Sequence, residues 1–158
     1  MTDSPTASAV LATTVTDLPS IVGRSFGPSG WREVTQAEVT AFADLTGDHN
    51  PIHVDPEAAA ATPYGTTIAH GLFTLSLVVP MMAEIFRVTG QSMGVNYGLN
   101  RLRFPAPVPT GSRIRVRGEV ASVDEVAGGY QLVASLVWEI EGGTKPVCAA
   151  ELVLRYFL

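Results

Sequence analysis

The stretch GLFTLSLVVPMMAEIFR, Gly71 to Arg87, is apolar around nearly the whole circumference of a helix. A helix with no polar face is buried on every side, so this segment is predicted to be a long helix at the centre of the fold. Pro80 lies inside it and is expected to kink or loosen it, because proline lacks the helical N–H donor. The run contains Thr74 and Ser76 and is too short and too polar to span a bilayer.

After Gly90 the pattern changes from helix to strand. Four long segments rich in Val, Leu and aromatic residues are separated by Pro and Gly turns: MGVNYGLNRLRF (93–104), SRIRVRGEVASV (112–123), GYQLVASLVWEIE (129–141) and PVCAAELVLRYFL (146–158). An apolar helix followed by four strands predicts an α+β fold, in which an antiparallel β-sheet wraps around a long central helix. This arrangement resembles the hot-dog fold. Because such a sheet has open edges, which two chains often cover by pairing edge to edge, we expect a dimer.

The composition favours one compact domain. The chain has 158 residues, of which 46% are hydrophobic and 16% charged, which argues against a disordered chain. Its net charge of −5 argues against non-specific nucleic-acid binding. Cys148 is the only cysteine, so no disulfide can form within the chain, and a reducing compartment is expected. Residues 1–17 lack the basic start of a signal peptide and are interpreted as a flexible tail before a single domain, 18–158. We expect a cytoplasmic protein with no membrane partner.

A turn rich in polar residues separates two predicted helices. The segment TQAEVTAFADLTG (35–47) predicts a helix with a capping box at its start and a glycine stop at its end. Asp55 and Pro56 then begin another helix as its N-cap and first residue. The nine residues GDHNPIHVD (47–55) therefore lie where the chain turns.

This turn brings together groups that can transfer protons. Pro51 removes a backbone donor and keeps Asn50 out of the α region, so no continuous helix joins Asp48 to His53. A turn can place both side chains in one small volume. A carboxylate and an imidazole within reach of one water molecule form an acid/base pair, and Asn50 can hold the turn through side-chain-to-backbone hydrogen bonds.

Each of these residues also has an interpretation without chemistry. Asp48 follows a helix-ending glycine and could be a plain loop or cap residue, and His53 could be a core histidine with satisfied hydrogen bonds. A metal site is a third possibility, because His49 and His53 have H-x-x-x-H spacing. However, Pro51 prevents the two from sharing a helical face as zinc-binding pairs do. No metal is therefore expected.

Gly71 lies at the start of the predicted central helix, after the loop TPYGTTIAH (62–70). The first N–H groups of a helix have no partner within the helix and lie at the positive end of its dipole. Glycine there lets a ligand approach the backbone closely, which is how an oxyanion hole for a thioester could be built. Alternatively, the glycine only lets the helix pack tightly under the sheet.

Two segments carry a family resemblance. FADLTGDHNPIHVD (42–55) and GTTIAHGLFTLSL (65–77) resemble the hydratase-2 signature of the MaoC-like dehydratases, the R-specific enoyl-CoA hydratases. The matching positions are Phe42, Thr46, Gly47, Asp48, Asn50, Pro51, Ile52, His53 and Ala59. A weaker resemblance covers about residues 20–158, including RFPAPVPTG (103–111).

The resemblance implies a hot-dog homodimer that adds water to trans-2-enoyl-CoA and forms (3R)-3-hydroxyacyl-CoA, in fatty-acid or related acyl metabolism. It implies that Asp48 and His53 hold the catalytic water, that the N–H of Gly71 holds the thioester oxygen, and that Asn50 braces the loop. Some family members have a serine further along the central helix. Val79 stands there in this chain, so that contact is expected to be absent.

The substrate would carry coenzyme A, and no separate cofactor is expected. Arg101 and Arg103 are the candidates for contacts with the CoA phosphates, although a solvated strand face is the plainer interpretation of every arginine in this region. Two other functions remain open. One is a hot-dog thioesterase, which would release free thiol from acyl-CoA. The other is a non-catalytic acyl-CoA-binding subunit, which would bind without turnover.

Overall fold

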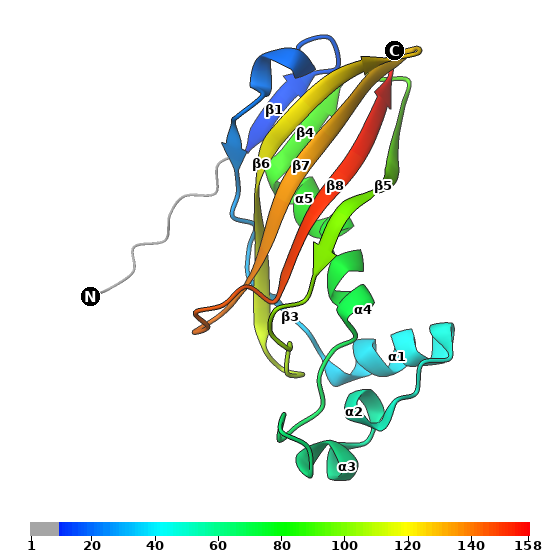
Figure 1. Ribbon diagram of the computed structural model, residues 1–158, viewed down its shortest axis with the longest axis vertical. Coiled ribbons are helices and arrows are strands. Elements are labelled where there is room, and N and C mark those ends of the chain that lie inside the picture. Colours follow the sequence, from blue (N-terminus) through cyan, green and yellow to red (C-terminus); the bar gives the residue numbers. More distant parts are fainter. Residues whose placement is uncertain (1–9) are drawn as a thin grey trace, which may run out of the picture.

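The computed structural model describes residues 10–158, which form a long curved sheet with helices on one face and at one end (Figure 1). The strands are β1 (Leu11–Thr14), β2 (Ser25–Phe26), β3 (Arg32–Glu33), β4 (Phe86–Thr89), β5 (Met93–Arg103), β6 (Arg113–Val126), β7 (Gly129–Ile140) and β8 (Cys148–Phe157). The helices are the 3₁₀ turn η1 (Leu18–Ile21), α1 (Gln36–Thr46), α2 (Pro51–Val54), α3 (Pro56–Ala60), α4 (Gly71–Ser76) and α5 (Val78–Ile85).

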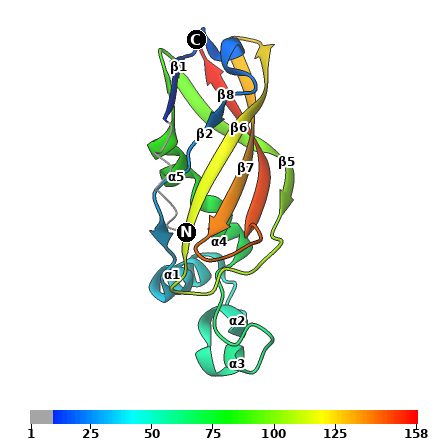
Figure 2. The ribbon, with the colours of Figure 1, turned by 90° about the vertical axis from the view of Figure 1, so that its left-hand side faces the viewer.

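The main sheet confirms the predicted α+β hot-dog architecture. Its strand order is β2-β6-β7-β8-β5, β3 also pairs with β6, and every pairing in this sheet is antiparallel. The four long predicted strands are β5 to β8. Figure 2 shows α5 beside the concave side of the sheet, with α1, α2 and α3 gathered at the far end. No helix within residues 10–158 is long and apolar enough to cross a membrane.

The central helix is divided in two. The sequence predicts one kinked helix from Gly71 to about Arg87, whereas α4 ends at Ser76, Leu77 lies between, and α5 ends at Ile85 before strand β4. The break lies just before Pro80, which has no N–H to donate to the carbonyl of Ser76 and crowds that carbonyl with its ring. The predicted disturbance is therefore confirmed, while the predicted length of the helix was too great.

The N-terminal segment differs from its prediction. Residues 10–17 were interpreted as part of a flexible tail, but β1 pairs in parallel with β4, and Leu11 and Val15 are buried in the common core. The pairing partner lies far along the chain, so no local pattern indicates it. Residues 1–9 of the predicted tail lie outside the described residues.

The predicted helix boundaries around the polar turn are confirmed. Thr35 and Glu38 form the capping box at the start of α1. Gly47 ends α1 with φ of 78°, a left-handed conformation that favours glycine. Asp55 caps α3 through the N–H groups of Glu57 and Ala58. These local signals fix where the chain leaves α1 and how it presents the next residues.

Candidate active site

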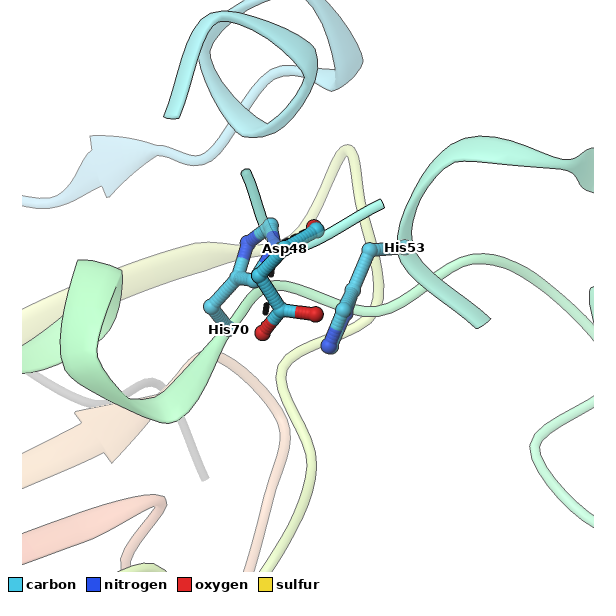
Figure 3. Close-up of side chains that lie close together, drawn as sticks. All are labelled: Asp48, His53 and His70. Atoms are coloured by element: carbon cyan, nitrogen blue, oxygen red, sulfur yellow. Dashed lines mark hydrogen bonds and ion pairs between the residues drawn. The ribbon is translucent and has the colours of Figure 1, made fainter. Parts of the chain in front are cut away.

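The turn after α1 brings Asp48 and His53 together, as the sequence predicts, and adds His70 to them. One donor atom from each of the three side chains lies within 4.8 Å of the others. Figure 3 shows the Asp48 carboxylate beside both imidazole rings. The side chain of Asp48 is 56% exposed, whereas both histidines are buried. The pair therefore combines a carboxylate open to water with an imidazole held in the protein interior.

His53 is fixed at both its ring and its backbone. Its Nδ1 lies 2.7 Å from the carbonyl oxygen of Ile68. Because a carbonyl only accepts, Nδ1 must carry the hydrogen, and in the neutral ring this leaves Nε2 as the acceptor. The side chain of Gln36 in α1 donates to the carbonyl of His53 over 2.8 Å and accepts from Thr67. Gln36 and Thr67 are supports that the sequence analysis missed.

Asn50 braces the turn, as predicted. Its side-chain oxygen accepts from the N–H of Ile52 at 3.3 Å, which makes Asn50 the N-cap of α2, with Pro51 at the first helical position. The N–H of Asn50 in turn reaches a carboxylate oxygen of Asp48 at 3.4 Å. This bracing bond is observed, whereas the catalytic roles of Asp48 and His53 stay predictions.

His70 is a site residue that the sequence analysis did not identify. It is 3% exposed, and its Nε2 donates to the backbone carbonyl of Asp48 over 2.9 Å. Its ring stacks on that of His53 with centroids 3.8 Å apart and planes 28° apart. The available signal was a polar residue directly before a buried apolar helix, where His70 is the N-cap of α4.

Gly71 is the first residue of α4, and its backbone N–H has no hydrogen-bond partner among residues 10–158. It does not have positive φ, so conformational freedom is not the reason for glycine here. Space is the reason, because a Cβ on Gly71 would lie 2.7 Å from the ring of Phe104. Tight packing against Phe104 thus explains why residue 71 is a glycine. This packing leaves the N–H of Gly71 available to a ligand.

A cavity of about 300 Å³ lies beside part of this site. Both His53 and Gly71 line it, and Tyr64 and Phe104 form part of its aromatic wall. A buried imidazole and a glycine with a free backbone N–H on one cavity are what a site for a polarised carbonyl needs.

The donor atoms of Asp48, His53 and His70 are close enough for a metal ion, but the orientation of the two rings argues against one. The lone pairs of imidazole nitrogens lie in the ring plane, so the stacked, nearly parallel rings of His53 and His70 cannot both point at one ion between them. His49, the other half of the H-x-x-x-H spacing, instead pairs with Asp44 at 2.8 Å on the surface. That hydrogen bond to Asp44 raises the pKa of His49 above its usual value.

The predicted CoA contacts lie elsewhere. Arg101 is 82% exposed on β5 and lies 3.9 Å from Glu151, and Arg103 donates to the carbonyl of Leu102. Neither arginine lines the 300 Å³ cavity. Val79, which occupies the serine position of some relatives, is exposed on α5 and lines a separate hollow under β8. The structure brings none of these three to the cavity.

The sheet wrapped around α4 and α5 places the chain among the hot-dog proteins, and comparisons with known proteins specify the family. The family profile described as MaoC like domain matches residues 17–139. The chain is 49% identical over 143 residues to 3-hydroxyacyl-thioester dehydratase Z of Mycobacterium tuberculosis, covering 90% of this chain and 95% of that protein. The chain belongs to the MaoC-like dehydratase family.

Two further proteins show how widely the likeness extends. Nodulation protein N of Rhizobium leguminosarum is 44% identical over 141 residues, which cover 87% of each chain. The solved structure of an (R)-hydratase from A. caviae involved in PHA biosynthesis superposes with a TM-score of 0.68 at 27% identity, covering 84% of this chain and 94% of that one.

Proposed function

We propose that this protein is a hydro-lyase that adds water reversibly to trans-2-enoyl-CoA and forms (3R)-3-hydroxyacyl-CoA. The observation that carries the proposal is the cavity lined by both His53 and Gly71, whose N–H has no partner among residues 10–158, with the Asp48 carboxylate beside His53. The names of the thioester dehydratase and the (R)-hydratase among the similar proteins describe the two directions of this reaction.

In the proposed reaction Asp48 and His53 activate one water molecule. Nε2 of His53 accepts a hydrogen bond from one O–H of the water, which stays intact and becomes the product hydroxyl, because Nδ1 is engaged with Ile68. Asp48 accepts the other proton as the oxygen bonds to C3 of the enoyl group. The C2=C3 double bond opens, and its electrons move onto the thioester oxygen. The coupled pair then returns one proton to C2 on the same face, which restores the thioester.

The proposed role of Gly71 is to stabilise the charge that develops on the thioester oxygen. Its N–H has no partner in the described part of the chain, residues 10–158, and therefore needs no bond to be broken there when the oxygen arrives. Proton transfer and this donor account for every step, so we propose that the reaction needs no cofactor beyond the coenzyme A of the substrate. Arg101 and Arg103 stay candidates for the CoA phosphates.

We also propose a homodimer, with a cytoplasmic location as predicted. Strand β5 ends the strand order of the main sheet, and its edge is unpaired within residues 10–158. It exposes the apolar side chains of Met93, Tyr97 and Leu99. An open strand edge with apolar side chains suits a second copy of the sheet.

Sedimentation of the purified protein is expected to give the mass of two chains, and a single-chain mass would contradict this assembly.

The activity itself is tested with crotonyl-CoA. We expect loss of the conjugated enone absorbance and, by chiral analysis, accumulation of the (3R) alcohol without free thiol. A purely (3S) product would contradict the family-like geometry. Thiol release would indicate a thioesterase, and tight binding without turnover would indicate a binding subunit.

The acid/base pair is tested by Asp48→Asn and His53→Gln, which preserve shape but remove proton transfer. Each is expected to lower kcat by about 10²–10⁴-fold while the melting temperature stays near that of the parent. The kcat of the double variant should be little lower than that of the less active single variant, because the two groups act as a unit. Hydration at a near-parent rate by either single variant would disprove the assignment.

Gly71 is tested by a matched pair of variants. Gly71→Ala and Gly71→Pro both add a Cβ that meets Phe104, but only proline removes the N–H. Proline suits the first position of a helix, and His70 before it already has the extended ψ of 139° that proline favours. We expect Gly71→Pro to hydrate about 10²–10³-fold more slowly than Gly71→Ala. Equal rates in two folded variants would mean that this N–H does not hold the thioester.

A further inference from the structure

His70 makes contacts that neither packing nor the proposed chemistry requires. Its Nδ1 is buried with no hydrogen-bond partner among residues 10–158. Its Nε2 makes the one hydrogen bond of the ring in these residues, to the Asp48 carbonyl, and lies 3.9 Å from Oδ2 of the Asp48 carboxylate. A buried polar atom without a partner lowers stability. An apolar side chain of similar size would fill the same space without this cost.

The carbonyl that His70 holds determines where the Asp48 carboxylate lies. The carboxylate is largely exposed, the N–H of Asn50 donates to it over a long 3.4 Å, and its Oδ2 lies 3.9 Å from Nε2 of His70, beyond hydrogen-bonding distance. Side-chain contacts therefore fix it weakly, and its position depends on its own backbone. That backbone follows Gly47 at the end of α1, where a glycine with φ of 78° permits motion unless a neighbour holds the chain.

His70 also relates Asp48 to the other two groups of the site. Its ring stacks on His53 at 3.8 Å, and it precedes Gly71 directly in the chain. One residue thus touches the carboxylate-bearing loop and the imidazole, and it sets the start of the helix that offers the N–H. Rigid placement of this kind is what holds a reacting group at productive distance, and misplacement by about 1 Å costs about 10²-fold in rate.

We propose that His70 is a positioning residue that clamps the backbone of Asp48 and thereby places its carboxylate opposite His53. This inference rests on the proposed function for its effect on turnover, but the clamp itself does not. His70 transfers no proton and contacts no substrate atom in this scheme. If the ring only filled space, a leucine of similar volume would serve as well.

The test compares His70→Leu, which removes the donor, with His70→Gln, whose amide can still donate to the Asp48 carbonyl. We expect His70→Leu to lower kcat by about 10²-fold with KM little changed, because transition-state placement alone is lost. The kcat of His70→Gln should lie within about tenfold of the parent value. Ser29→Ala is the control. Ser29 is buried like His70, and its hydroxyl accepts a hydrogen bond from the N–H of Val116, far along the chain. This variant should lower the melting temperature and leave kcat intact.

A double-mutant cycle identifies the partner through which His70 acts. In an Asp48→Asn background there is no carboxylate to place. Adding His70→Leu to this variant should therefore lower kcat by less than about threefold. A further 10²-fold loss would show that His70 acts elsewhere and would overturn the proposal. So would an unchanged kcat for His70→Leu in the parent background.

Amide hydrogen exchange tests the clamp without turnover. The N–H groups of His49 and His53 bond to carbonyls within the loop, so they report its opening. In His70→Leu these amides should exchange faster than in the parent, and in His70→Gln at the parent rate. Unchanged exchange in His70→Leu would overturn the clamp even if the parent hydrates enoyl-CoA. Faster exchange in a protein that hydrates nothing would support the clamp and refute the proposed function instead.

Discussion

The burial of α5 is the constraint on which the rest of the structure depends. One face of this helix is apolar and buried, with Met81 and Ile85 almost completely removed from water, while Val79 and Glu84 on its other face are exposed. The long curved strands cover this buried face, and β1 with β4 lies at the far end of the helix. The curvature leaves one end of the helix pair uncovered by the sheet, and α1, α2 and α3 gather there. The site lies at that end.

The break before Pro80 changes how the N-terminus of the central helix acts on a ligand. A long helix would contribute a dipole along its axis, whereas α4 has 6 residues and is separated from α5 by Leu77. In the proposed site, the electrostatic contribution at Gly71 would therefore come mainly from its own N–H, which has no partner among residues 10–158 and would act at hydrogen-bonding distance. Such a donor requires exact placement of the ligand. The close contact between Gly71 and Phe104 supplies one wall for this placement.

The parts of the fold that follow local rules could be predicted from sequence. The capping box of α1, the stop at Gly47, the turn at Pro51 and the four long strands each follow from neighbouring residues, and the structure has them where expected. Pairing of β1 with β4 joins residues 75 positions apart, as Leu11 with Phe86, and no local pattern encodes it. His70 and Gln36 were missed for the same reason, because their roles arise from partners brought close by packing.

Each group of the site is held by a different element, which makes the site a product of helix packing. Gln36 in α1 holds the backbone of His53, Ile68 in the loop before α4 holds its ring, and His70 at the start of α4 holds the backbone of Asp48. A shift of α1 relative to α4 would therefore move the two halves of the acid/base pair in different directions. The geometry between Asp48 and His53 is thus determined by how α1 and α4 pack, and only secondarily by the turn that joins them in sequence.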